Sequence, residues 1–157
     1  MLSSSFLPRV DELPLDLSGV IAKSNLIRMA FEAVDATQWP RPLPALPDRT
    51  PEPVFRTLLA FCYTTGVFAS AEIAEMATTD PTVRYLCAND NPSFEAVRVF
   101  RRQNISHLRE TLARMLHHVW TELHPDEGEV RSFLPFLAEA DRRIRLAIAA
   151  DSATMDD

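Results

Sequence analysis

The chain has 157 residues, of which 46% are apolar, and it carries a formal net charge of −6. This length suits a single domain with a sizeable core, and the acidic balance argues against strong binding to nucleic acid. Only residues 54–114 hold more bases than acids, seven against six. No segment resembles a signal peptide or reaches the length of a membrane span, so we expect a cytoplasmic protein.

The first third of the chain is predicted to contain an arm, a helix and a connector. Residues 1–17 should form an extended arm, because Pro8 and Pro14 block a long helix. Ser18 is expected to cap a helix that runs to about residue 34. Residues 38–53 contain six of the twelve prolines and should form a stiff, extended connector. The expected buried face of the first helix consists of Ile27, Phe31 and Val34.

The next segment should form the centre of the domain. Thr50 is expected to cap a helix that contains the run VFRTLLAFCYTTGVF and stops at Gly66. A helix that is apolar almost all round is typically buried. Cys62 and Cys87 also lie among apolar residues without metal-binding spacing, so they should be buried thiols in a reducing cytosol.

Three shorter helical segments follow. Ser70 should cap the segment AEIAEMA, and Asp80 with Pro81 should start another helix that ends near residue 87. An asparagine-rich turn at residues 89–92 precedes Ser93, the expected cap of a helix that contains FEAVRVFRRQN.

The strongest periodic pattern lies in the last third. Apolar residues spaced three and four apart predict a long amphipathic helix from residue 105 to residue 123. A last helix should begin near Pro135, and the polar tail at 151–157 should fray. The expected fold class is therefore all-α: one domain over residues 1–157, forming a compact multi-helix bundle with a helix-turn-helix-like centre. The apolar stripe of the long helix comprises Ile105, Leu108, Leu112, Met115, Leu116, Val119 and Leu123.

Residues 51–114 resemble the N-terminal helical domain of bacterial DDE-type insertion-sequence transposases. The matching features, in order, are PEPVFRTLLAFCYTTGVF, SAEIAEM, DPTVRYL, NPSFEAVRVFRRQN and a long amphipathic helix. The resemblance implies a module that recognises transposon-end DNA. Family members continue into a ribonuclease-H-like catalytic domain with three metal-binding carboxylates, for which this chain has no room. We therefore expect no catalysis, no cofactor, no metal and no small-molecule substrate.

A first candidate DNA-binding element lies at residues 70–87. Ile73, Ala74, Val83 and Leu86 occupy positions that face inward in a helix-turn-helix, although the spacing is one residue short. The residues then expected to face a major groove are Thr82, Arg84 and Tyr85. The alternative is two short packed helices without a role in DNA binding.

A second candidate element is the arginine set Arg98, Arg101 and Arg102. These residues are three and four apart, so one helix face should present all three to phosphate. Asn104 extends this polar surface. The alternative is a solvated face on which arginines pair with neighbouring acids such as Glu95.

Histidine and acidic residues do not suggest further chemistry. His117 and His118 are adjacent and point about 100° apart on a helix, so they cannot chelate one metal together. The carboxylates are scattered over polar faces, and we expect them to be solvated.

Two functional hypotheses remain open at the level of sequence. The first is a non-catalytic DNA-binding module derived from a transposase, either a regulator or a remnant of a mobile element. The second is a protein-interaction or dimerisation module that has lost DNA binding. A homodimer is expected if the apolar faces of the last two helices are uncovered. In the alternative, the connector and first helix fold back over them in a monomer.

Overall fold

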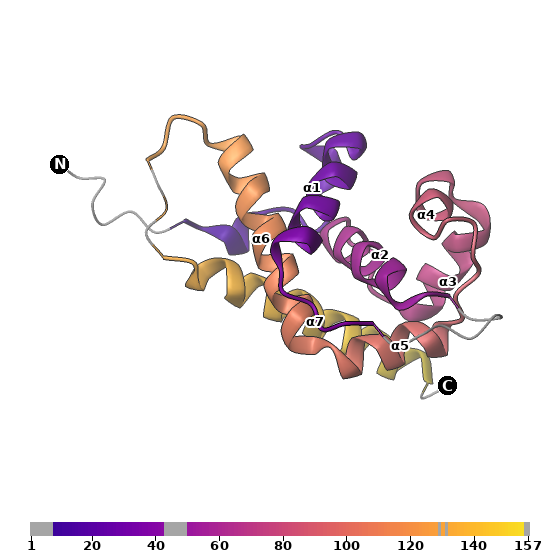
Figure 1. The fold of residues 1–157 in the computed structure, drawn as a ribbon. Coiled ribbons are helices and arrows are strands. Elements are labelled where there is room, and N and C mark those ends of the chain that lie inside the picture. Colours follow the sequence, from indigo (N-terminus) through magenta and orange to yellow (C-terminus); the bar gives the residue numbers. More distant parts are fainter. Residues whose placement is uncertain (1–7, 43–49, 129, 131, 156–157) are drawn as a thin grey trace.

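The structure is a computed structural model, and it describes residues 8–42, 50–128, 130 and 132–155. Over these residues it contains seven α-helices and no β-strand, with one isolated backbone bridge between Asp16 and Thr65. The prediction of an all-α bundle is thus confirmed (Figure 1). The helices are α1 (Lys23–Ala36), α2 (Glu52–Thr64), α3 (Ser70–Thr79), α4 (Pro81–Leu86), α5 (Phe94–Gln103), α6 (Ile105–Leu123) and α7 (Leu134–Met155).

Helix α2 is the central element, as its apolar composition predicts. Every residue from Phe55 to Thr64 is buried, and the helix contacts α1, α4, α5, α6 and α7. Gly66 follows with a φ of +81°, a left-handed conformation that ends the helix and that glycine adopts without strain. Thr50 does not cap this helix; Pro51 precedes it and makes no side-chain cap.

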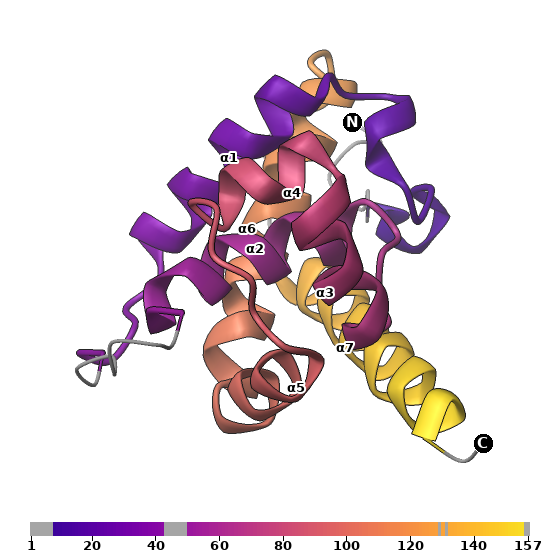
Figure 2. The same cartoon turned by 90° about the vertical axis from the view of Figure 1, so that its right-hand side faces the viewer.

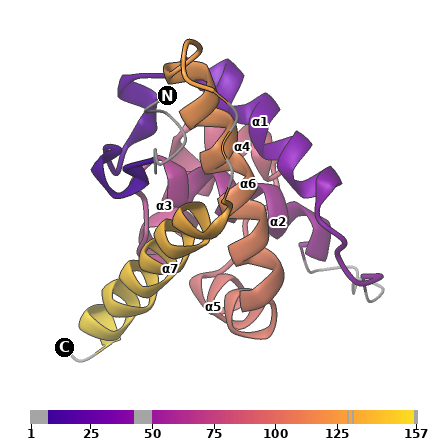
Figure 3. The same ribbon diagram turned by 90° about the vertical axis from the view of Figure 1, so that its left-hand side faces the viewer.

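Helices α6 and α7 form a closely packed pair in which α7 crosses α6 obliquely (Figures 1 and 3). The apolar stripe of α6 is covered within the chain by α1, α2 and α7. At the two ends of the stripe, Ile105 remains 37% exposed and Leu123 is half-buried. The five other stripe residues have no exposed surface. The α6 part of the face that motivated a homodimer is therefore covered within the described chain, and the first helix folds over it as the alternative expects. On α7, Ile148 remains 41% exposed.

The start of the connector packs against α5 and α6 through Trp39. Its ring stacks against those of Phe100 and His107, with ring centroids 5.8 and 5.4 Å away. The Arg56 guanidinium lies 4.7 Å from the ring centroid and donates a hydrogen bond to the Pro40 carbonyl oxygen at 2.9 Å. The predicted connector residues 43–49, which include Leu43 and Leu46, lie outside the described residues.

The N-terminal predictions need three corrections. Residues 8–19 are not an extended arm but contain two 3-10 turns, Val10–Glu12 and Leu17–Gly19, because burial of Val10 and Leu17 anchors them to the core. Ser18 lies in the second turn, and α1 begins only at Lys23. The buried face of α1 is also rotated from the predicted one, with Phe31 43% exposed. Its buried residues are Leu26, Met29, Ala30 and Ala33.

Candidate functional site

The first candidate element is formed by α3 and α4, which pack against each other and are joined by Asp80 alone. Asp80 caps α4, because its carboxylate accepts a hydrogen bond from the Val83 backbone N–H at 3.0 Å. Ile73, Val83 and Leu86 are buried, as the inward positions of the motif require, whereas the fourth such position, Ala74, is only half-buried. The connection is nevertheless tighter than the three- or four-residue turn of a helix-turn-helix, and α4 has only six residues.

The outward side of α4 presents the residues that the sequence suggested. Tyr85 is 65% exposed, Arg84 is exposed and Thr82 is half-buried. Arg84 is the only base on α3 and α4, whereas Glu72, Glu75 and the connecting Asp80 supply three acids. The electrostatic attraction of this pair of helices for phosphate is therefore small.

The second candidate element, α5, begins at a cap that the sequence predicts. The Ser93 hydroxyl oxygen accepts a hydrogen bond from the Ala96 backbone N–H at 3.1 Å. Arg102 is exposed, but the Arg98 side chain is only 25% exposed and Arg101 is buried. The expectation that one face presents all three arginines to a ligand is wrong for Arg101, because this side chain points into the core.

Arg101 is buried because it meets a carboxylate from the last helix. Its Nη1 donates to Asp151 Oδ2 at 2.7 Å and lies 3.4 Å from the Tyr63 hydroxyl. Burial by itself lowers the pKa of Arg101, but Tyr63 and Asp151 together raise it. Burial also raises the pKa of Tyr63 to about 12. This guanidinium is therefore held charged inside the protein.

Asn104 is also withdrawn from the predicted surface. It is 8% exposed, and its side-chain amide donates a hydrogen bond to the Phe100 carbonyl oxygen at 2.9 Å. This bond satisfies one of the open carbonyl groups at the end of α5. The position of Asn104 is thus explained by helix termination.

The two candidate elements do not form one surface. Helices α4 and α5 each pack against α3 and lie apart from each other in all three views (Figures 1, 2 and 3). Arg84 and Tyr85 therefore belong to one region of the molecule, and Arg102 belongs to another.

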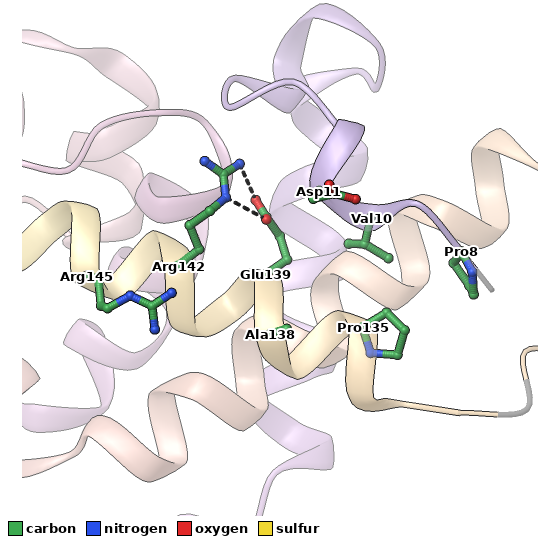
Figure 4. A pocket seen from close by; sticks show the side chains of 8 residues that line it. All are labelled: Pro8, Val10, Asp11, Pro135, Ala138, Glu139, Arg142 and Arg145. Atoms are coloured by element: carbon green, nitrogen blue, oxygen red, sulfur yellow. Dashed lines mark hydrogen bonds and ion pairs between the residues drawn. The ribbon is translucent and has the colours of Figure 1, made fainter.

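A shallow hollow of about 260 Å³ lies elsewhere, between the N-terminal turn and the first half of α7 (Figure 4). Arg142 is already bound there, because its Nε and Nη2 donate to the two oxygens of Glu139 at 2.9 and 3.0 Å. The hollow brings together no nucleophile and base. Its lining residues are Pro8, Val10, Asp11, Pro135, Ala138, Glu139, Arg142 and Arg145.

The remaining possible metal ligands and nucleophiles lie in structural surroundings. Among the described residues, no three His, Cys, Asp or Glu side chains are grouped to hold a metal. His117 packs edge-on against Phe136. Its pKa is lowered mainly by burial and to a smaller extent by the neighbouring His118. Cys62 and Cys87 are both buried with free thiols, as predicted. No helix in the described part of the chain is long and apolar enough to cross a membrane.

Sequence reasoning missed the two most buried charge clusters, which centre on Asp151 and Arg143. Both residues lie on the inner side of α7, where the buried positions Phe136, Ala140, Ile144 and Ala147 recur three and four apart. Continuing this period by four residues reaches Asp151. A charged residue in register with an apolar stripe could therefore have indicated a buried carboxylate at Asp151. It was missed because residue 151 was assigned to a frayed tail.

No protein-family profile, curated protein or solved structure matches this chain.

Proposed function

We propose that this chain is a non-catalytic helical domain of the transposase N-terminal type that binds duplex DNA weakly through α4. The observation that carries the proposal is the exposed Arg84–Tyr85 pair on a helix whose opposite side is anchored by buried Val83 and Leu86. Arginine donates to phosphate oxygens and guanine edges, and tyrosine adds a hydroxyl for phosphate contact. The resemblance over residues 51–114 points to the same partner.

The magnitude of binding follows from the small number of exposed cations. With Arg84 as the single base of α3 and α4, few counterions are released, so affinity should be measurable only at low salt and should depend modestly on salt concentration. Replacing Arg84 with Ala should weaken binding and reduce the slope of log affinity against log salt by about 1.

The experiment is fluorescence anisotropy of a labelled duplex titrated with protein at several salt concentrations. Arg84→Ala and Tyr85→Ala are the test variants. Arg102→Ala is the matched control, because it removes another exposed arginine, from α5. Equal losses from Arg84→Ala and Arg102→Ala would show that α4 has no special role, and no binding by the unaltered chain at low salt would refute the proposal. Magnesium-dependent cleavage of the duplex would refute its non-catalytic part.

A second candidate is a protein-contact surface at the same place. The observation that favours it is the 65% exposure of the large Tyr85 ring on an acidic chain, since tyrosine is enriched in protein interfaces. Light scattering at micromolar concentration tests the homodimer. A mass of 17.7 kDa indicates a monomer, whereas a doubled mass that Tyr85→Ser returns to 17.7 kDa would favour this candidate over DNA.

A further inference from the structure

The first turn of α3 is capped by a carboxylate from the other end of the chain. Ala69, at the capping position, has no side chain that could do this. Asp151 of α7 caps the helix instead. Its Oδ1 accepts a hydrogen bond from the Ser70 backbone N–H at 2.7 Å, and its Oδ2 accepts one from the Ser70 hydroxyl at 2.7 Å. These donors are 81 residues from their acceptor in sequence. A helix N-terminus with open N–H groups favours an anion at this position.

Two arginines of α5 complete the surroundings of this carboxylate. Arg101 Nη1 donates to Asp151 Oδ2 at 2.7 Å, and Arg98 Nε lies 4.0 Å from the same oxygen. Arg98 Nε is buried and has no hydrogen-bond partner in the described part of the chain. Two guanidinium groups thus face one carboxylate, and one donor is left over. Asp151 accepts three hydrogen bonds from this cluster, and at 4.0 Å its Oδ2 is too far away to accept one from Arg98 Nε.

We propose that Ser70, Arg98 and Arg101 form an oxyanion-binding cradle at the start of α3, which Asp151 closes from within the chain. The chemical class of the ligand is an oxyanion with more acceptor atoms than a carboxylate, such as phosphate. A third oxygen on the ligand would accept a hydrogen bond from Arg98 Nε, which has no such partner while Asp151 occupies the cradle. The end of α7 is then an autoinhibitory contact, since its carboxylate and the ligand compete for the same donors.

The end of α7 is suited to such a role. It extends past α6 as the outermost part of the helix pair (Figures 2 and 3). Asp151 is buried, but Ser152 and Ala153 after it are exposed. Asp151 itself is therefore the anchor of this last part of the helix, and its removal should open the cradle while the Phe136–Ala147 stripe keeps α7 in place.

The test is Asp151→Ala in the full chain, with thermal unfolding followed in potassium phosphate and in potassium chloride of equal ionic strength. We expect the variant to have a lower Tm than the unaltered chain in chloride and to recover at least about 3 °C in millimolar phosphate, because a ligand that binds only the folded state stabilises it. The unaltered chain should show no such gain. Asp141→Ala is the matched control, since it removes an exposed carboxylate from the same helix.

Several outcomes decide the proposal. Phosphate rescue of Asp151→Ala that disappears in the double variant Asp151→Ala with Arg101→Met supports the cradle. Equal Tm values in phosphate and chloride overturn it. If the variant does not fold in chloride, folding in phosphate supports the cradle, and failure in both salts overturns it.

A short labelled duplex as a second probe distinguishes the source of the phosphate. Tighter duplex binding by Asp151→Ala than by the unaltered chain assigns the cradle to a nucleic-acid phosphate, and rescue by free phosphate alone assigns it to a small oxyanion. Arg84→Ala should leave the rescue unchanged, so the cradle and the α4 proposal can fail separately.

Discussion

Replacing Arg143 with Met should be among the most destabilising substitutions in this chain. Arg143 has no exposed surface, and Met fills much of its volume without the guanidinium. Three of its hydrogen bonds hold backbone carbonyl oxygens: Nη1 donates to Leu15 at 2.9 Å and to Tyr63 at 2.8 Å, and Nη2 donates to Pro14 at 2.9 Å. Its Nε donates to Glu139 at 2.9 Å. One side chain therefore ties the N-terminal turns and α2 to α7.

The size of the effect follows from these contacts. Removing one partner of a buried ion pair costs about 3–5 kcal/mol, and each unsatisfied buried carbonyl adds about 1–3 kcal/mol unless water reaches it. Arg142 still neutralises Glu139, and water can reach Pro14 and Leu15, which are exposed in the folded chain. We therefore use the lower limits, about 3 kcal/mol for the ion pair and about 1 kcal/mol for the Tyr63 carbonyl. The expected loss in the free energy of unfolding is about 4 kcal/mol. For a domain of this size, that corresponds to roughly 8–16 °C in Tm.

Urea unfolding followed by far-ultraviolet circular dichroism measures this loss. The control is Arg145→Met, because Arg145 is a 67%-exposed arginine on the same helix whose ion pair with Asp141 spans 3.5 Å. Such an exposed pair contributes between about 0 and 1 kcal/mol. If Arg143→Met and Arg145→Met lower the urea midpoint equally, the assignment of Arg143 as the central tie is wrong.

Two further predictions concern titratable groups. Because burial lowers the pKa of His117, the unfolded chain binds a proton more readily, and the free energy of unfolding should fall as the pH drops below about 6.5. His117→Gln should reduce this slope more than His118→Gln, which alters an exposed ring, and identical slopes in the two variants would contradict the reasoning. Burial also raises the pKa of Cys62, and it raises that of Cys87 to about 11, so both groups are thiols at neutral pH. Alkylation of the native protein should therefore be slow and both thiols should react in denaturant, whereas rapid modification of either one in the native state would refute their burial.

The helices themselves follow closely from local sequence. The apolar run of α2 predicts a buried central helix, and the stripe of α6 predicts residues 105–123. Asp80 and Ser93 act as the predicted caps, whereas Ser18, Thr50 and Ser70 do not. These features depend on periodicity and on side chains that bond their own neighbouring backbone, and both are encoded within a few residues.

The candidate DNA site was only partly predictable. The outward positions on α4 follow from helical periodicity, because Val83 and Leu86 fix which side is buried. The spacing of Arg98, Arg101 and Arg102 predicted a shared helix face, but spacing cannot say whether that face meets solvent or another helix. That decision depends on Asp151, which lies 50 residues beyond Arg101.

The sequence by itself therefore determined the all-α class, most helix positions and the burial of α2 and α6. Tertiary structure alone decided the fate of the charges and the N-terminal turns. The cap of α3 comes from α7, and Arg143 binds carbonyl oxygens 128 and 129 residues away. Such contacts form because folding removes water from the Arg143 guanidinium and from Ser70, so each must find a partner wherever the packed chain brings one.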